Sequence, residues 1–136
     1  MNSRRVILLL ALATLFLVGC GNRASGLPGT CWRWVEIDGR APLIDAEATL
    51  AFDAKSVTGS TGCNRYFGEY TASRGALAFG VLGQTEMACL EPKGIMAQER
   101  AYLDALARAE QFTVVDDQLT IRCEGGQVLV FSAADE

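Results

Sequence analysis

The chain has 136 residues, a formal net charge of −4 and no histidine. The acidic balance argues against a nucleic-acid partner, because binding to phosphates needs a clustered basic surface. The lack of histidine excludes Ser-His and Cys-His nucleophile pairs and any histidine-ligated metal site, and we expect neither a metal nor another cofactor.

Residues 1–19 have the pattern of a bacterial signal peptide. Arg4 and Arg5 form a positive n-region, and residues 6–18 form an apolar run that is too short for an ordinary transmembrane helix. The n-region also resembles a twin-arginine signal, although its short length favours the general secretory route. The run ends at residues 17–20 in Leu-Val-Gly-Cys, which resembles the lipobox of lipoproteins. We therefore expect a lipid on Cys20 that attaches the protein to a membrane.

The residues that follow Cys20 predict the location of the protein. Gly21 and Asn22 come next, and the aspartate that would resemble an inner-membrane retention signal is absent. This favours the periplasmic side of the outer membrane. Residues 20–28 are interpreted as the lipidated N-terminus and a short flexible tether. Residues 29–132 then form one domain of the 117-residue mature chain, whose formal charge is −6.

The mature chain is predicted to contain short strands and one helix. Pro92 can open a helix but cannot lie inside one, and residues 95–109 are rich in good helix formers. Strands on both sides of a single helix, with short links, imply an antiparallel α+β fold in which a curved sheet wraps the helix. The β-prone or alternating runs that predict strands are residues 30–37, 49–52, 56–58, 66–72, 76–81, 112–115, 119–123 and 127–131.

The mature chain has four cysteines besides Cys20, and an even number in an exported protein indicates disulfides. Three connectivities are possible, and a four-thiolate zinc site is a rival with unsuitable spacings. If Trp32 faces the core, Cys31 faces outward, whereas Cys123 shares the parity of Ile121, so these two cysteines pair only across a bulge or strand end. The four are Cys31, Cys63, Cys89 and Cys123.

Several spaced motifs occur along the mature chain: Gly29-x-x-Trp32, Gly59-x-x-Gly62-Cys63-Asn64, Thr85-x-Met87-Ala88-Cys89, a helix with Glu99, Tyr102 and Leu106, and closing strands at 119–121 and 129–131. Together they resemble the META domain family, the group of HslJ-like envelope lipoproteins. The resemblance covers roughly residues 27–132. It implies a compact, incompletely closed β-barrel packed with one α-helix. It also implies a Cys63–Cys89 disulfide, which leaves Cys31 to pair with Cys123.

The lack of histidine and of any motif that would activate a nucleophile predicts a non-catalytic protein that binds an unknown envelope protein or small ligand. The resemblance further implies a lipoprotein involved in envelope stress or antibiotic resistance. A turn pinned by a disulfide presents side chains at little ordering cost, so Asn64, Arg65 and Tyr66 form the candidate interaction turn. Asn64 in such a turn can instead satisfy the local backbone. Glu99 and Arg100 are interpreted as solvated helix charges.

Two alternative functions remain open. The first is a chaperone that resembles secretin pilot lipoproteins and binds a partner helix or an acyl chain in its barrel, for which an exposed apolar groove would be expected. The second is an inhibitor of periplasmic enzymes of the lysozyme type, for which a protruding loop with a charged tip would be expected.

Overall fold

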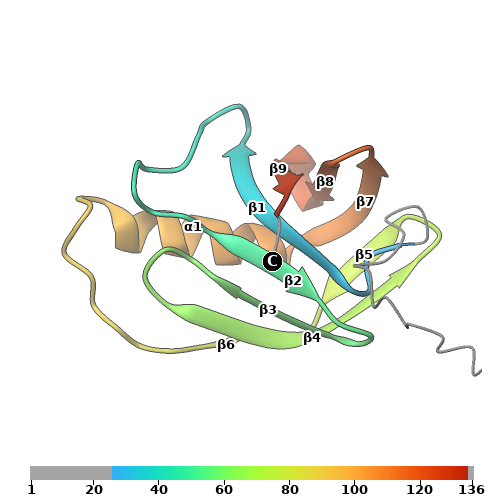
Figure 1. Ribbon diagram of the computed structural model, residues 1–136, viewed down its shortest axis with the longest axis horizontal. Coiled ribbons are helices and arrows are strands. Elements are labelled where there is room, and N and C mark those ends of the chain that lie inside the picture. The colour runs from blue at the N-terminus through green and yellow to red at the C-terminus, as the bar shows by residue number, and fades with distance from the viewer. Residues whose placement is uncertain (1–25, 135–136) are drawn as a thin grey trace, which may run out of the picture.

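The computed structural model describes residues 26–134. These residues form nine β-strands and one α-helix, which lies across the sheet in Figure 1. None of the helices in this range is long and apolar enough to cross a membrane. The predicted signal peptide and Cys20 lie outside the described residues, so their assignments stay predictions.

Eight of the strands form an antiparallel ring. Going around it, the order is β3-β2-β1-β9-β8-β7-β5-β4, and β3 also pairs with β4, which closes the ring. A ninth strand, β6 (Gly83–Gln84), pairs with β4 outside the ring. The antiparallel α+β barrel predicted from the sequence is therefore confirmed. The ring strands are β1 (Thr30–Ile37), β2 (Thr49–Phe52), β3 (Ser56–Ser60), β4 (Arg65–Ser73), β5 (Ala76–Phe79), β7 (Ala109–Val115), β8 (Gln118–Cys123) and β9 (Val128–Ala133).

The join between β5 and β7 has the fewest residue pairs in the ring. These strands share one residue pair, Ala76 with Gln111, beside which the amide of Phe112 donates to the carbonyl of Gly75 at 2.8 Å. The other joins in the ring have two to six residue pairs each, with five between β8 and β9. The ring is thus closed, whereas the sequence predicted incomplete closure, and its join with the fewest residue pairs is the one between β5 and β7.

Alternation along the strands fills the barrel with large apolar side chains. In β1, Trp32 and Trp34 are buried while Arg33 is exposed, because successive side chains of a strand point to opposite faces. The interior is therefore packed rather than hollow. The largest side chains that are almost fully buried are Trp32, Tyr66, Tyr102, Phe131, Leu27, Leu50, Leu77, Ile95, Leu106, Leu119, Ile121 and Leu129.

The helix α1 (Ile95–Ala107) supplies one face to this core. Its Tyr102 is fully buried and its ring centroid lies 5.0 Å from Trp34, 5.9 Å from Tyr66 and 6.3 Å from Phe131. These three rings come from β1, β4 and β9, so one helical side chain contacts strands on different sides of the barrel. Gly59 of β3 makes room for this cluster, since a Cβ there would collide with the carbonyl of Thr49 and the hydroxyl of Tyr66.

The fold begins before residue 29, which corrects the predicted tether. Leu27 is 1% exposed and belongs to the core, and its carbonyl accepts a hydrogen bond of 2.6 Å from the hydroxyl of Thr30. The amide of Gly29 donates to Phe52 at 2.8 Å. The small and polar composition around Leu27 suggested a linker, but its apolar side chain is buried. Residues 26–28 line a surface hollow together with Ser73 and Arg74.

Candidate interaction site at the β3–β4 turn

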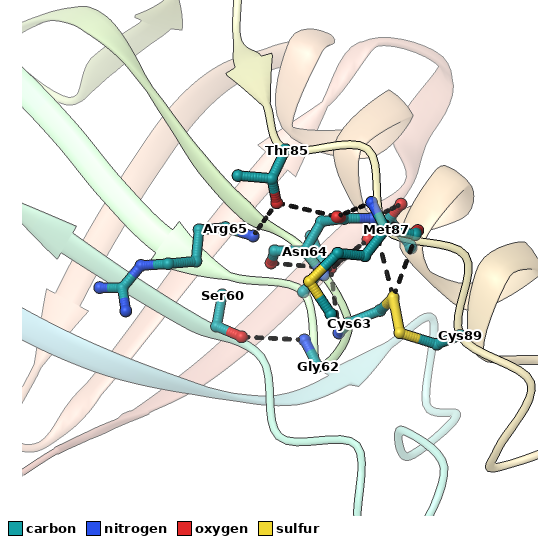
Figure 2. The surroundings of a disulfide bond; sticks show 10 residues. Ser60, Gly62, Cys63, Asn64, Arg65, Thr85, Met87 and Cys89 are labelled. Atoms are coloured by element: carbon teal, nitrogen blue, oxygen red, sulfur yellow. Dashed lines mark hydrogen bonds between the residues drawn. A yellow bond between two sulfur atoms is a disulfide. The ribbon is translucent and has the colours of Figure 1, made fainter.

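The turn of residues 61–64 joins β3 to β4, and the predicted disulfide lies within it. Cys63 is bonded to Cys89 with a Cα–Cα distance of 6.0 Å, as Figure 2 shows, so this pairing is confirmed. Gly62 has φ of 93°, and a Cβ there would lie 3.1 Å from the Cα of Ala46. Glycine is therefore needed both for the left-handed conformation and for the contact with the β1–β2 loop.

Asn64 connects the turn to two other parts of the chain. Its side-chain amide donates to the carbonyl of Met87 at 3.1 Å and to Glu99 Oε1 at 3.0 Å. Its Oδ1 accepts hydrogen bonds from the hydroxyl of Thr85 at 2.8 Å and from the amide of Met87 at 2.7 Å (Figure 2). Asn64 is 1% exposed, so its side chain binds the protein's own backbone and helix rather than a partner.

Glu99 supplies the helical side of this polar network. Its Oε2 accepts hydrogen bonds from the hydroxyl of Thr61 and, at 3.1 Å, from the amide of Asn64. The prediction of a solvated Glu99 is wrong, since the residue is 4% exposed. Residues 95, 99, 102 and 106 follow helical spacing, and this pattern places Glu99 on the same buried face as Tyr102.

The other two residues of the candidate interaction turn point in opposite directions. Tyr66 is 1% exposed, and its hydroxyl donates to the carbonyl of Thr49 at 2.6 Å and bonds that of Tyr102 at 2.9 Å. Burial and the neighbouring Tyr102 raise the pKa of Tyr66 well above its usual value. Arg65 is exposed, so among Asn64, Arg65 and Tyr66 the arginine alone presents its side chain to solvent. The interaction turn as predicted is therefore wrong for two of its three residues.

A two-segment ribbon extends the turn. Residues 81–89 run antiparallel along residues 63–68: Thr85 N donates to Arg65 O at 3.0 Å, Phe67 pairs with Gly83, and the Cys63–Cys89 bond lies at one end. The ribbon was not predicted from the sequence, because residues 80–92 lack a regular period. We use the name ribbon face for Arg65 and the exposed apolar side chains on or directly after the ribbon. These are Phe67 (57% exposed), Val81 (95%), Met87 (59%) and Leu90 (86%), which follows Cys89.

The second predicted disulfide, between Cys31 and Cys123, is not formed. Cys123 is a buried free cysteine. It faces the core from β8, whereas Cys31 lies next to the core-facing Trp32 on β1 and so points outward. Strand β9 also lies between β1 and β8. Burial is the main cause that raises the pKa of Cys123 to about 11, so its thiol is a weak nucleophile at neutral pH.

Other candidate sites are surface hollows. One of about 640 Å³ lies beside Lys55, Glu69 and Phe79, and another of about 580 Å³ lies beside Arg74 and Arg122 at the join between β5 and β7. Across residues 26–134, no group of three or more His, Cys, Asp or Glu side chains is arranged to hold a metal ion.

Comparison with known proteins agrees with this architecture. The family model of the META domain matches residues 25–136. A protein from Burkholderia xenovorans, solved by NMR, is 32% identical with a TM-score of 0.66; the alignment covers 81% of this chain and 85% of that one. Another NMR structure is 27% identical with a TM-score of 0.61 and coverage of 78% and 90%.

A crystal structure of a DUF4847 family protein from Bacteroides vulgatus shares the fold at 12% identity, with a TM-score of 0.62 and coverage of 81% and 96%. No curated protein matches the chain. The family match spans most of the chain, including the Gly59-x-x-Gly62-Cys63-Asn64 turn and the helix that carries Glu99. The chain belongs to the META domain family.

Proposed function

We propose that this META domain protein is a non-catalytic lipoprotein, anchored through Cys20 on the periplasmic side of the outer membrane, that binds an envelope protein through its ribbon face. Its physiological role is in envelope stress or antibiotic resistance. The observation that carries the proposal is the exposure of Met87 and Leu90 on a segment that is held at fixed geometry by the Cys63–Cys89 bond.

Binding through the ribbon face carries a low ordering cost. Apolar side chains that stay in water are commonly scattered, and a contiguous group marks an interaction surface. A mobile loop would lose conformational entropy on binding, whereas the backbone of Met87 is already fixed by two hydrogen bonds to Asn64. The ribbon face thus presents apolar area at low cost, with Arg65 beside it to fix the orientation of a partner.

Because the barrel interior is packed, the outer surface is a better candidate for the binding site than a central cavity. An acyl chain or helix bound inside, as in the pilot-like alternative, would have to displace side chains such as Tyr102 and Phe131, which are fully buried. The lysozyme-inhibitor alternative has one supporting observation, the exposed Arg74 at the tip of the β4–β5 hairpin. The ribbon face is favoured because four of the large exposed apolar side chains lie on or directly after the ribbon, on a backbone that is held by the disulfide.

The anchor is tested by intact-mass analysis and sucrose-gradient fractionation of the wild type and the Cys20→Ser variant. We expect acylated wild-type protein in the outer-membrane fractions and unacylated variant outside them. Soluble wild-type protein with a free thiol at Cys20 would contradict the proposal.

The binding face is tested with a photoreactive amino acid placed at Met87 or Leu90 in cells. The control position is Val115, which is 65% exposed on β7 and lies outside the ribbon. We expect both ribbon positions to crosslink the same envelope protein, which mass spectrometry identifies, and the Val115 position not to do so. Absence of a product, or equal products from all three positions, would overturn the proposal. Hydrolytic turnover in a broad substrate screen would overturn its non-catalytic part.

A further inference from the structure

We propose that the partner binds as an extended segment that adds a β-strand to the free edge of β6. This inference rests on the proposed function and names the class of partner: a protein segment recognised through its backbone, with an apolar side chain placed beside Phe67. Three features of the ribbon lead to it.

The first feature is an unpaired edge. The sheet order ends at β6, so within residues 26–134 no strand lies on its outer side. Tyr66 pairs with Gln84 and Phe67 with Gly83, and Thr85 donates its amide to Arg65 at 3.0 Å. Backbone groups alternate in direction along a strand, so the amide and carbonyl of Gln84 point away from β4. Gln84 is exposed, and its outward groups can pair with another chain.

The second feature is an apolar surface beside this edge. Phe67 lies over Gly83, where an added Cβ would come within 2.9 Å of the ring. Because Gly83 has no side chain, the ring remains open toward the edge and is 57% exposed. A strand added next to β6 would place one side chain opposite Gly83, in contact with this ring, and the next outward one near Val81. An apolar residue at those positions fits the surface.

The third feature is the lack of protection against such pairing. Exposed edges are commonly blocked by lysine, proline or an inward charge. The five residues from Val81 to Thr85 contain neither a charged residue nor a proline. The backbone of Met87, two residues after this stretch, is held by a hydrogen bond to Asn64, which limits the movement of the edge. An extended partner satisfies the free backbone groups, which a docked helix does not.

The test removes the outward amide of Gln84 and leaves the inner ladder unchanged. Gln84→Pro deletes an N–H that does not bond β4, and Gln84→Ala is the matched control that retains it. Each change is combined with the photoreactive residue at Leu90, which lies outside the edge. We expect Gln84→Pro to reduce the yield of the crosslinked partner about tenfold and Gln84→Ala to leave it unchanged. Melting temperatures of the two variants, compared with wild type, show whether each remains folded.

A second measurement uses the crosslinked partner segment as a synthetic peptide. Binding of this peptide should slow hydrogen exchange at the Gln84 amide. N-methylation of every second amide of the peptide should abolish binding when the methylated amides are those that face β6, and should not do so when they are the others. Equal crosslinking by folded Gln84→Pro and Gln84→Ala variants would overturn strand addition while leaving the proposed function in place. No crosslink from Met87 or Leu90 would overturn both. A product formed between two copies of this chain would overturn the assignment of a separate partner.

Discussion

The two turns at the ends of β4 are built on different principles. The β3–β4 turn at residues 61–64 has Thr61 and Asn64 buried at 1% exposure, with hydrogen bonds to Glu99 of the helix and to Met87 in the loop before it. The β4–β5 turn consists of exposed Arg74 and half-buried Gly75, with φ of 51° and 84°. It is bonded to the neighbouring strand by the Phe112 amide.

The conformation of one turn is thus specified by neighbouring residues, and that of the other by residues distant in the sequence. The β4–β5 turn follows a hairpin pattern in which positive φ values match the twist of the strands, so a few neighbouring residues suffice to specify it. The β3–β4 turn depends on Glu99, which is 35 residues after Asn64, and on Cys89. Substitutions in the first turn should therefore act locally, whereas those in the second should loosen three segments together.

The largest effect is expected for Asn64→Ala. The change removes four side-chain hydrogen bonds to oxygen or nitrogen atoms of Glu99, Thr85 and Met87, besides a long contact of 3.7 Å to Cys63 Sγ. At about 1 kcal/mol each, the free energy of unfolding should fall by about 4 kcal/mol in urea denaturation. The matched change Arg74→Ala in the other turn should alter it by less than about 0.5 kcal/mol. Similar losses for both variants would contradict the distinction between the turns.

Removal of the disulfide should have the next largest effect. The closed loop of 26 residues predicts a loss of about 3 kcal/mol for the double variant Cys63→Ser, Cys89→Ser. Because Asn64 still bonds Met87 and Glu99, we expect the variant to fold cooperatively. Urea denaturation and near-UV circular dichroism measure both. A variant without cooperative unfolding would show that the polar network cannot hold the turn alone.

Alkaline pH should distinguish the two ends of β4. Burial raises the pKa of Tyr66 and of Tyr102 above the usual value of 10.0, and burial and Asp53 raise that of Tyr70. A raised folded-state pKa means that the unfolded chain loses its proton first. The free energy of unfolding is therefore unaffected below pH 10 and falls above it, by up to about 1.4 kcal/mol per pH unit for each group.

The control for this prediction compares two single variants. Tyr66→Phe should flatten the decline above pH 10 more than Tyr70→Phe does, because Tyr66 is the more deeply buried. The free energy of unfolding is measured by urea denaturation between pH 9 and 11. If it falls equally steeply with pH in both variants, Tyr66 is no better shielded from water than Tyr70.

The smallest effect is expected for Arg74→Gly. Arg74 has φ of 51°, a conformation that costs a residue with a side chain more than it costs glycine. Relief of this strain is opposed by the greater freedom of glycine in the unfolded chain. We expect a net change within about 0.5 kcal/mol of zero. A loss above about 2 kcal/mol would show that the Arg74 side chain makes contacts that stabilise the turn.

Sequence patterns predicted the barrel well where periodicity was strong. The alternation of Trp32 and Trp34 with Arg33 identified β1, and helix formers after Pro92 identified α1. Strand β6 was missed because it has two residues, one of them glycine, and no period is visible over such a length. Residues 26–28 were assigned to a tether because the residues around Leu27 are small and polar, although Leu27 itself is buried.

The candidate site was harder to predict because its partners are distant in sequence. The residues around Asn64 are equally compatible with an exposed turn and with a buried one. The turn is buried because Glu99, distant in the sequence, bonds Asn64. The buried face of α1 was available from the spacing of residues 95, 99, 102 and 106, but charge took precedence over spacing in the interpretation of Glu99. The predicted Cys31–Cys123 disulfide is absent because the two side chains point to opposite faces of the sheet, as the alternation along their strands had already indicated.

The point where the chain enters the barrel sets how the protein would stand on a membrane. Gly26 lines a hollow together with Ser73 and Arg74 and follows Cys20 by six positions, a span of at most about 20 Å. If Cys20 carries a lipid, as proposed, the chain at Gly26 beside the β4–β5 turn would lie within about 20 Å of the anchor. The nine residues of β4 extend about 30 Å, so the disulfide lies at the end of this strand that is far from the β4–β5 turn. The barrel would then separate the β6 edge, near the disulfide end of β4, from the anchored end of the domain.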